Sequence, residues 1–172
     1  MSRKLITKNC VTGTSYNYSF QYEFLALRRR LYDAYKVHSN AHDRRNHNMK
    51  NFYCKIFINS LITMEQLSNQ ISELLNFKLV RNSIESDFFS IDFFKNKEFD
   101  EEKAKEFPDG FLYFPYFLDV DIVDESREAE YKEIIKKIMF YLWSEECQLV
   151  VSSDFEDELP HKGGYKSLIN YN

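Results

Sequence analysis

The sequence is poor in cysteine, glycine and proline, with three, four and three of them among 172 residues. Cys10, Cys54 and Cys147 lie far apart and form no Cys-x-x-Cys pair, which argues against a disulfide framework and a thiolate zinc site. No run of 18 or more apolar residues is present, so no membrane span is predicted. The first ten residues, MSRKLITKNC, lead into no apolar signal segment, and we expect a cytoplasmic protein.

The common phosphate-binding and metalloprotease motifs are also missing. The sequence contains neither GxxxxGK followed by Ser or Thr, nor GxGxxG, nor HExxH. The pair Gly163-Gly164 follows a strand-like segment and could expose amide groups to an anion. It is more typical of a turn, in which glycine supplies a positive φ angle, and we predict a turn.

Aromatic residues are abundant, with 16 Phe and 12 Tyr in a chain that is 44% hydrophobic. This composition excludes a wholly disordered chain, and the length suits one domain with a real core. The charge is unevenly distributed: residues 1–48 carry nine Lys and Arg against three Asp and Glu, and residues 49–172 carry 14 against 24. We therefore predict a basic N-terminal extension, residues 1–48, and an acidic domain, residues 49–172.

The apolar periodicity predicts the elements of both parts. In the extension, residues 20–37 have one helical apolar face, and a polar linker follows. In the domain we expect a strand at 52–58, a helix capped by Thr63 and Gln66, one or two strands within 77–96, a strand at 111–123 that contains Pro115, a helix capped by Ser126, and a last strand from 148. This order, β-α-β-β-α-β, predicts an α+β, ferredoxin-like split arrangement with two helices on one face of a four-stranded antiparallel sheet.

Four carboxylates raise the alternative of a metal-dependent enzyme. Asp119 and Asp121 are two residues apart on one strand and share a face, and Asp154 and Glu156 could do the same at the end of the last strand. Together they could gather Mg²⁺ for nuclease-type or nucleotidyl-transfer chemistry. A solvated acidic face is the more common use of such residues, and we predict that use here.

The other candidate groups also favour ordinary structural roles. His38 and His42 are four residues apart but lie in the polar linker, and Cys54 and Cys147 fall on apolar faces. The arginines of the extension, at 28–30 and 44–45, could contact nucleic acid, but the acidic remainder of the chain does not favour that partner. We predict no catalytic residue, no metal and no cofactor.

The strand FLYFPYFLDVDIV has apolar residues on both faces, which requires either a covering element or a partner. Together with DG before it, with FYLWSEEC and with VVSSDFEDELPHKGGY, it resembles small immunity proteins of bacterial polymorphic-toxin systems over about residues 50–165. The resemblance implies a cytosolic antitoxin that binds one toxin domain and has no active site of its own. Residues 1–48 lie outside it.

Under this hypothesis a basic toxin domain meets an acidic, aromatic-rich surface. The predicted electrostatic rim is Asp154, Glu156, Asp157 and Glu158. The predicted anchors are Tyr113, Tyr116, Trp143 and Tyr165, although Trp143 could equally cap the core. The remaining alternative is a regulatory or structural domain that associates with itself, with paired sheet edges, as a homodimer.

Overall fold

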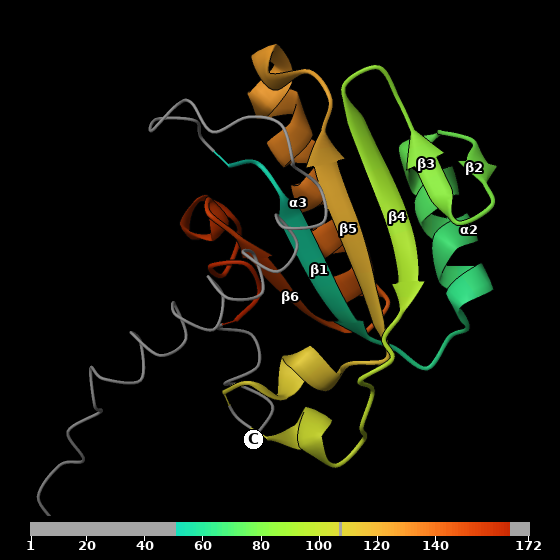
Figure 1. Ribbon diagram of the computed structural model, residues 1–172, viewed down its shortest axis with the longest axis vertical. Helices are drawn as coiled ribbons and strands as arrows, with labels where there is room; N and C mark the ends of the chain where they lie inside the picture. Colours follow the sequence, from blue (N-terminus) through green and yellow to red (C-terminus); the bar gives the residue numbers. More distant parts are fainter. Residues whose placement is uncertain (1–50, 107, 166–172) are drawn as a thin grey trace, which may run out of the picture. The chain divides into compact units, whose positions relative to one another are not determined.

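The computed structural model describes residues 51–106 and 108–165, which form one six-stranded antiparallel sheet and two α-helices (Figure 1). The predicted α+β class is confirmed. The predicted extension, residues 1–48, lies outside the described residues. The elements are β1 (Cys54–Asn59), α2 (Met64–Leu75), β2 (Leu79–Val80), β3 (Ser83–Glu85), β4 (Phe89–Lys95), β5 (Tyr116–Ile122), α3 (Glu128–Ser144) and β6 (Gln148–Ser153). The short 3-10 helices are η1 (Lys103–Lys105), η2 (Gly110–Tyr113), η3 (Glu125–Arg127) and η4 (Glu156–Glu158).

The strands lie in the order β2-β3-β4-β5-β1-β6, with every neighbouring pair antiparallel. The predicted four-stranded sheet was too small, because residues 79–95 hold three strands instead of one or two. The additional strands, β2 and β3, are two and three residues long and form an edge hairpin beside β4. The first strand, β1, lies between β5 and β6.

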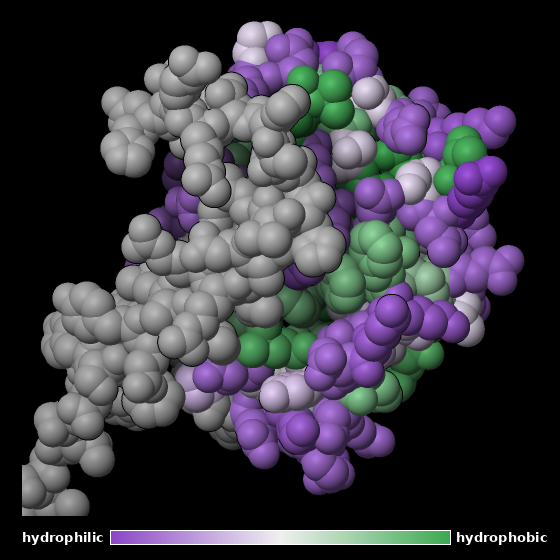
Figure 2. Space-filling view, viewed as in Figure 1, coloured by the Kyte–Doolittle hydropathy of each residue, from purple (hydrophilic) through white to green (hydrophobic). Residues whose placement is uncertain are grey.

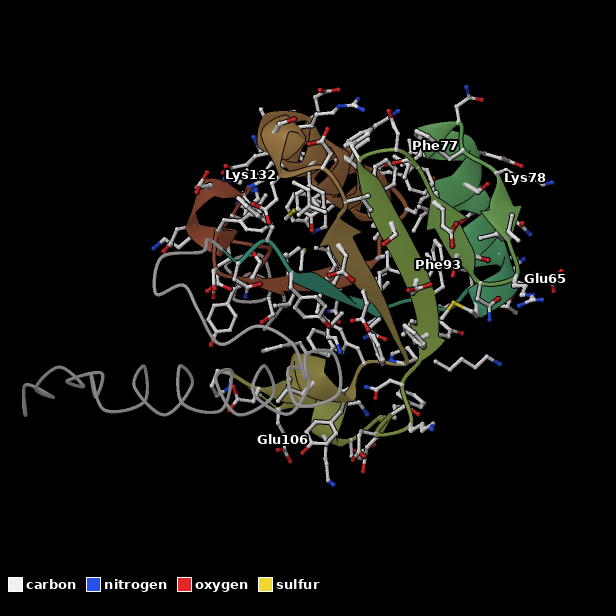
Figure 3. All side chains as sticks on the ribbon, turned by 45° about the horizontal axis from the view of Figure 1, so that its top comes forward. Glu65, Phe77, Lys78, Phe93, Glu106 and Lys132 are labelled. Atoms are coloured by element: carbon white, nitrogen blue, oxygen red, sulfur yellow. The ribbon has the colours of Figure 1, made fainter. Side chains whose placement is uncertain are left out.

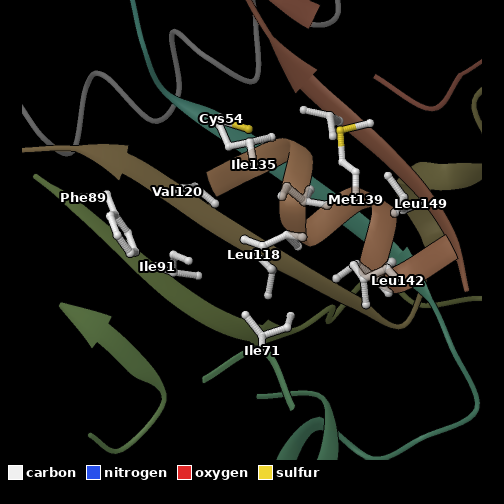
Figure 4. Close-up of a cluster of buried hydrophobic side chains, with 14 of the residues drawn as sticks. Cys54, Ile71, Phe89, Ile91, Leu118, Val120, Ile135, Met139, Leu142 and Leu149 are labelled. Atoms are coloured by element: carbon white, nitrogen blue, oxygen red, sulfur yellow. The ribbon is translucent and has the colours of Figure 1, made fainter. Parts of the chain in front are cut away.

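Both helices pack against one face of the sheet and enclose the hydrophobic core (Figure 4). Alternate side chains of each long strand point into this core, as the period of two in a strand requires. Ile71 of α2, together with Ile135, Met139 and Leu142 of α3, meets the strand residues there and is fully buried. The opposite face carries no α-helix among the described residues, and Figure 1 views the sheet from that side. The 3-10 helix η2 covers part of this face, because the Phe111 ring lies 5.2 Å from the ring of Phe57 in β1 and both are buried.

One of the two predicted helix caps is confirmed and the other was wrong. At α2 the Thr63 side chain accepts a hydrogen bond from the backbone N–H of Gln66, and the Gln66 side chain accepts one from the backbone N–H of Thr63. At the second helix Ser126 is not the cap. The Asp124 side chain accepts the Ser126 backbone N–H at 3.0 Å and begins η3, which continues directly into α3.

The strand predicted over 111–123 begins later than expected. Residues 110–113 form η2, and β5 starts at Tyr116, directly after Pro115. β5 is a central strand of the sheet. Pro115 precedes its ladder, so the edge position or bulge that a proline inside a strand requires is not needed. Phe111 and Phe114 are both buried, 3% and 1% exposed, so the strict alternation expected through this segment holds only from Tyr116 onward.

In the described part of the chain, no helix combines the length and the apolar character that a membrane span needs.

Candidate functional site

The face of the sheet that is opposite the helices carries a row of charged residues across its three central strands. In the strand register Asp92 of β4 is opposite Asp119 of β5, and Asp119 is opposite Lys55 of β1. Asp121 lies two residues beyond Asp119 on the same strand and therefore on the same face, as predicted. The face thus carries three carboxylates and one ammonium group, and we call these four residues with Phe94 and Phe117 the open face.

Asp119 is the best-paired of the three carboxylates. The Tyr53 hydroxyl donates to its Oδ1 at 2.5 Å, and Lys55 Nζ lies 3.2 Å from the same atom. Asp92 accepts a hydrogen bond from the Ser83 hydroxyl on β3. Among the described residues no Lys, Arg or His lies within salt-bridge distance of Asp92 or Asp121.

Burial raises the pKa of the Asp121 carboxyl, and the negative charges of Asp119 and Asp92 raise that pKa further. Both effects favour the protonated acid, because the ionised form loses hydration and faces like charges. The open face is therefore a place where negative charge accumulates without full compensation.

Phenyl rings lie beside these charges. Phe94 and Phe117 stack with ring centroids 5.1 Å apart, and Phe57 lies 6.3 Å from Phe117. Lys55 Nζ lies 4.2 Å from the centroid of the Phe117 ring, which is a cation–π distance. Phe94 is 42% exposed, and Figure 2 shows hydrophobic atoms beside hydrophilic ones over the lower parts of β4 and β5. The open face thus combines aromatic surface with acidic groups.

The predicted acidic rim lies after β6 and is partly neutralised within the chain. Glu158 lies 2.7 Å from Lys132 Nζ, and Asp157 lies 3.2 Å from Lys162 Nζ. Figure 3 labels Lys132, which joins α3 to this loop and also lies 2.6 Å from Glu128. Asp154 accepts a hydrogen bond from the Asn51 side-chain amide at 3.1 Å. The last strand ends at Ser153, so Asp154 and Glu156 do not continue its alternation, and Glu156 lies in η4 instead.

The four predicted aromatic anchors do not share one surface. Tyr116 and Trp143 are partly buried against the core, on the side of the sheet that the helices cover. The Trp143 ring contacts His161 and Phe140, with centroids 5.3 and 5.7 Å away. Tyr113 lies in η2 under Lys103, and the Tyr165 ring lies 6.5 Å from Phe111. A partner could contact all of them only by covering both sides of the molecule.

The pair Gly163-Gly164 forms the predicted turn, and this turn closes an edge of the sheet. The backbone N–H of Val151 in β6 donates to the carbonyl oxygen of Gly163 at 2.6 Å. Both glycines have positive φ angles, +71° and +87°. A Cβ atom at Gly164 would lie 2.5 Å from the carbonyl oxygen of Leu149, so no larger residue fits against the strand. The backbone of the turn thus occupies the outer side of β6.

The arrangement needed for the metal-dependent alternative is not seen. Among the described residues, no group of three or more His, Cys, Asp and Glu side chains could hold a metal ion, and this includes Asp119, Asp121, Asp154 and Glu156.

Cys54 is fully buried, and burial with the nearby Asp121 raises the pKa of its thiol well above the usual value. A hollow of about 610 Å³ lies on the helix side, between α2 and α3, lined by Leu74, Glu133, Lys136, Lys137, Phe140, Tyr141 and Ser144.

The comparisons with known proteins found no matching family model, no matching curated protein and no matching solved structure. The resemblance to immunity proteins therefore stays a prediction. Sequence reasoning placed Asp119 and Asp121 on one face but missed Asp92, Lys55 and Phe94. The signal for Asp92 and Phe94 was present, because they alternate with the buried Ile91 and Phe93 in β4.

Proposed function

We propose that the protein is an immunity-type protein that binds a basic toxin domain and blocks it. The observation that carries the proposal is the open face, on which partly exposed phenyl rings lie beside carboxylates that outnumber their cations. Aromatic side chains are frequent anchors of protein interfaces, and complementary charge accelerates association. Many toxin domains that act on nucleic acid are basic, so an acidic inhibitor suits them.

Two further features support this proposal. Residues 49–172 contain ten more acidic than basic residues, which gives the domain a negative electrostatic field that attracts a basic protein.

We also propose that the domain belongs to the ferredoxin-like class, since the long strands lie in the order β4-β5-β1-β6 with both helices on one face. Among the described residues, η2 covers the second face near Phe57, and the part over β4 and β5 is available for a partner.

The test is a pull-down with the tagged full chain from a lysate of the source cells, followed by mass spectrometry and an activity assay of the captured protein. We expect one basic protein that is released at high salt and whose toxicity in a heterologous host is suppressed by co-expression of this chain. A captured protein that remains toxic in the presence of excess chain would contradict the proposal.

A charge-matched pair of variants sharpens this test. One variant reverses three charges of the predicted rim, Asp154→Lys, Glu156→Lys and Asp157→Lys. The control reverses three exposed charges elsewhere, Glu98→Lys, Glu101→Lys and Glu102→Lys. The rim variant should bind at least about tenfold more weakly than the control, because rim charges contribute through their place at the interface and not through net charge alone. Equal binding by the two variants would remove the predicted rim from the interface.

A further inference from the structure

The open face repeats one arrangement of side chains on two neighbouring strands. On β5, Asp119 and Phe117 are two residues apart and share the face; on β4, Asp92 and Phe94 have the same spacing and the same face. The register places the two pairs opposite each other, carboxylate facing carboxylate and ring facing ring. Each strand therefore offers one carboxylate with one phenyl ring beside it.

Only the pair on β5 has its own cation. Lys55 Nζ lies 3.2 Å from Asp119 and 4.2 Å from the centroid of the Phe117 ring, so its charge is held by both groups at once. Asp92 and Phe94 have no Lys or Arg in this position among the residues that the structure describes. Asp92 and Phe94 on β4 thus provide the same carboxylate and ring as Asp119 and Phe117 on β5, but they lack a cation such as the Lys55 ammonium group.

The charges around the site on β4 are unfavourable in the free chain. Asp92 and Asp119 are directly opposite across the ladder, and like charges in this position are destabilising. Asp121 lies on the same face, and Phe94 keeps 42% of its surface exposed to water. A cation that arrives from outside would relieve the repulsion and cover the ring.

We infer that the site formed by Asp92 and Phe94, with Asp121 next to Asp92 on the side away from Phe94, receives an arginine or lysine side chain of a basic protein partner. Arginine suits the site best, since its planar guanidinium stacks on a ring while it donates to carboxylates. The charge pattern disfavours a second copy of this chain as the occupant of the face. A symmetric contact would place this patch, with its three carboxylates and one ammonium group, against an identical patch. The inference rests on the proposed function and names the surface that serves it.

The experiment measures binding of a fluorescent nona-arginine peptide to the full chain by anisotropy at low salt. The test variant carries Asp92→Asn and Asp121→Asn, and asparagine at 92 can still accept the Ser83 hydroxyl. The control variant carries Glu101→Gln and Glu102→Gln, whose side chains are 81% and 85% exposed, and it has the same net charge. We expect the test variant to bind about five- to tenfold more weakly and the control less than about twofold, in line with partly buried and exposed charge pairs.

A second pair of variants tests the aromatic part of the site. Phe94→Ala should weaken binding of the peptide about threefold, whereas Phe140→Ala, which removes a 57% exposed ring on α3, should leave it unchanged. Equal weakening by the two charge variants would show that the peptide responds to net charge alone and would overturn the inference. Absence of any binding by the wild-type chain would overturn it as well.

Carbodiimide labelling of carboxyl groups shows whether another occupant covers the face. Asp92 and Asp121 should react in the chain alone and be protected when the peptide is present. Protection without the peptide would overturn the inference, since a second copy or another part of the chain would then cover the face. In the lysate pull-down, a partner retained equally by wild type and by the Asp92→Asn, Asp121→Asn variant would leave the proposed function intact and remove this face from it. If the peptide binds as expected but no toxin is captured from the lysate, the cation site on this face is supported and the proposed function is not.

Discussion

At the scale of single residues, Tyr131 places a hydroxyl group inside the hydrophobic core. It is fully buried on α3, and its hydroxyl lies 2.8 Å from the carbonyl oxygens of both Phe52 and Val120. This hydroxyl links the start of β1 to β5 from inside the helix layer. An apolar ring of the same shape would leave a buried carbonyl group without a donor.

Tyr131→Phe should therefore lower the free energy of unfolding by about 1–3 kcal/mol, the usual cost of a buried unsatisfied polar group. Urea denaturation followed by circular dichroism measures the change. Tyr141→Phe is the matched control, because the Tyr141 hydroxyl makes no hydrogen bond to another described residue. A loss of the same size in both variants would show that the Tyr131 hydrogen bonds contribute nothing specific.

Asp121 allows a prediction about pH. Its carboxyl has a raised pKa because of burial and because of Asp119 and Asp92, so the folded state binds this proton more tightly than the unfolded state does. Ionisation of Asp121 therefore costs stability above its folded pKa, and the cost disappears as the pH falls below the unfolded value of about 3.9.

Asp121→Asn should stabilise the protein at pH 7 by roughly 0.2–1 kcal/mol, the size of cross-strand charge effects, and the gain should vanish near pH 3. Thermal melts at the two pH values measure it, and Asp157→Asn, at a side chain that is 79% exposed, is the control. A gain that is equal at both pH values would not come from the charge of Asp121.

At the scale of elements, the glycine turn protects the long edge of the sheet. An edge strand exposes unpaired N–H and C=O groups that can pair with another chain. Here the turn bonds to β6, and the opposite edge ends in the two-residue strand β2. Neither edge offers a long free ladder, which does not favour the alternative of a dimer joined at its sheet edges.

Gly164→Ala should destabilise the domain by at least about 1–2 kcal/mol. Alanine is strained at a positive φ angle, and its Cβ would clash with the carbonyl oxygen of Leu149. The variant should also aggregate faster, which light scattering at constant temperature measures. Lys162→Gly is the control of opposite sign: Lys162 already has φ of +52°, so glycine there should be neutral or slightly stabilising. Faster aggregation of the control variant would contradict this account.

The caps of the two helices show what sequence could and could not predict at this scale. Thr63 and Gln66 have the spacing of a capping box, and the signal is local, so it was predicted correctly. Ser126 was predicted as the cap of the second helix, but Asp124 caps η3 instead, and nothing local in the sequence shows that a 3-10 turn precedes the helix. Asp124→Ala should cost about 1 kcal/mol in a denaturation experiment, and Ser126→Ala clearly less.

The open face shows the same limit between local and distant information. The alternation of β4 and β5 can be read along the chain, so each strand's face was accessible to sequence reasoning. The register that places Asp92 opposite Asp119, and Lys55 beyond it, joins segments far apart in sequence and depends on the packing of the whole sheet. The position of Gly163 beside Val151 is of the same kind.

At the scale of the whole molecule, the acidic open face and the covered edges predict a single-chain species in the absence of a partner. Size-exclusion chromatography with light scattering should give the mass of one chain at micromolar concentration, in 0.15 M salt and also in 0.5 M salt. A mass of two chains at both salt concentrations would contradict this prediction and favour the self-associating alternative.

The central position of β1 also has a consequence for the order of events on the ribosome. This strand is the first one synthesised in the described domain, yet its neighbours β5 and β6 begin about 60 and 90 residues later. At about 5–20 residues per second, the nascent chain carries an unpaired, apolar middle strand for on the order of ten seconds. Translation speed across residues 60–150 should therefore influence how much of the protein is recovered in native form.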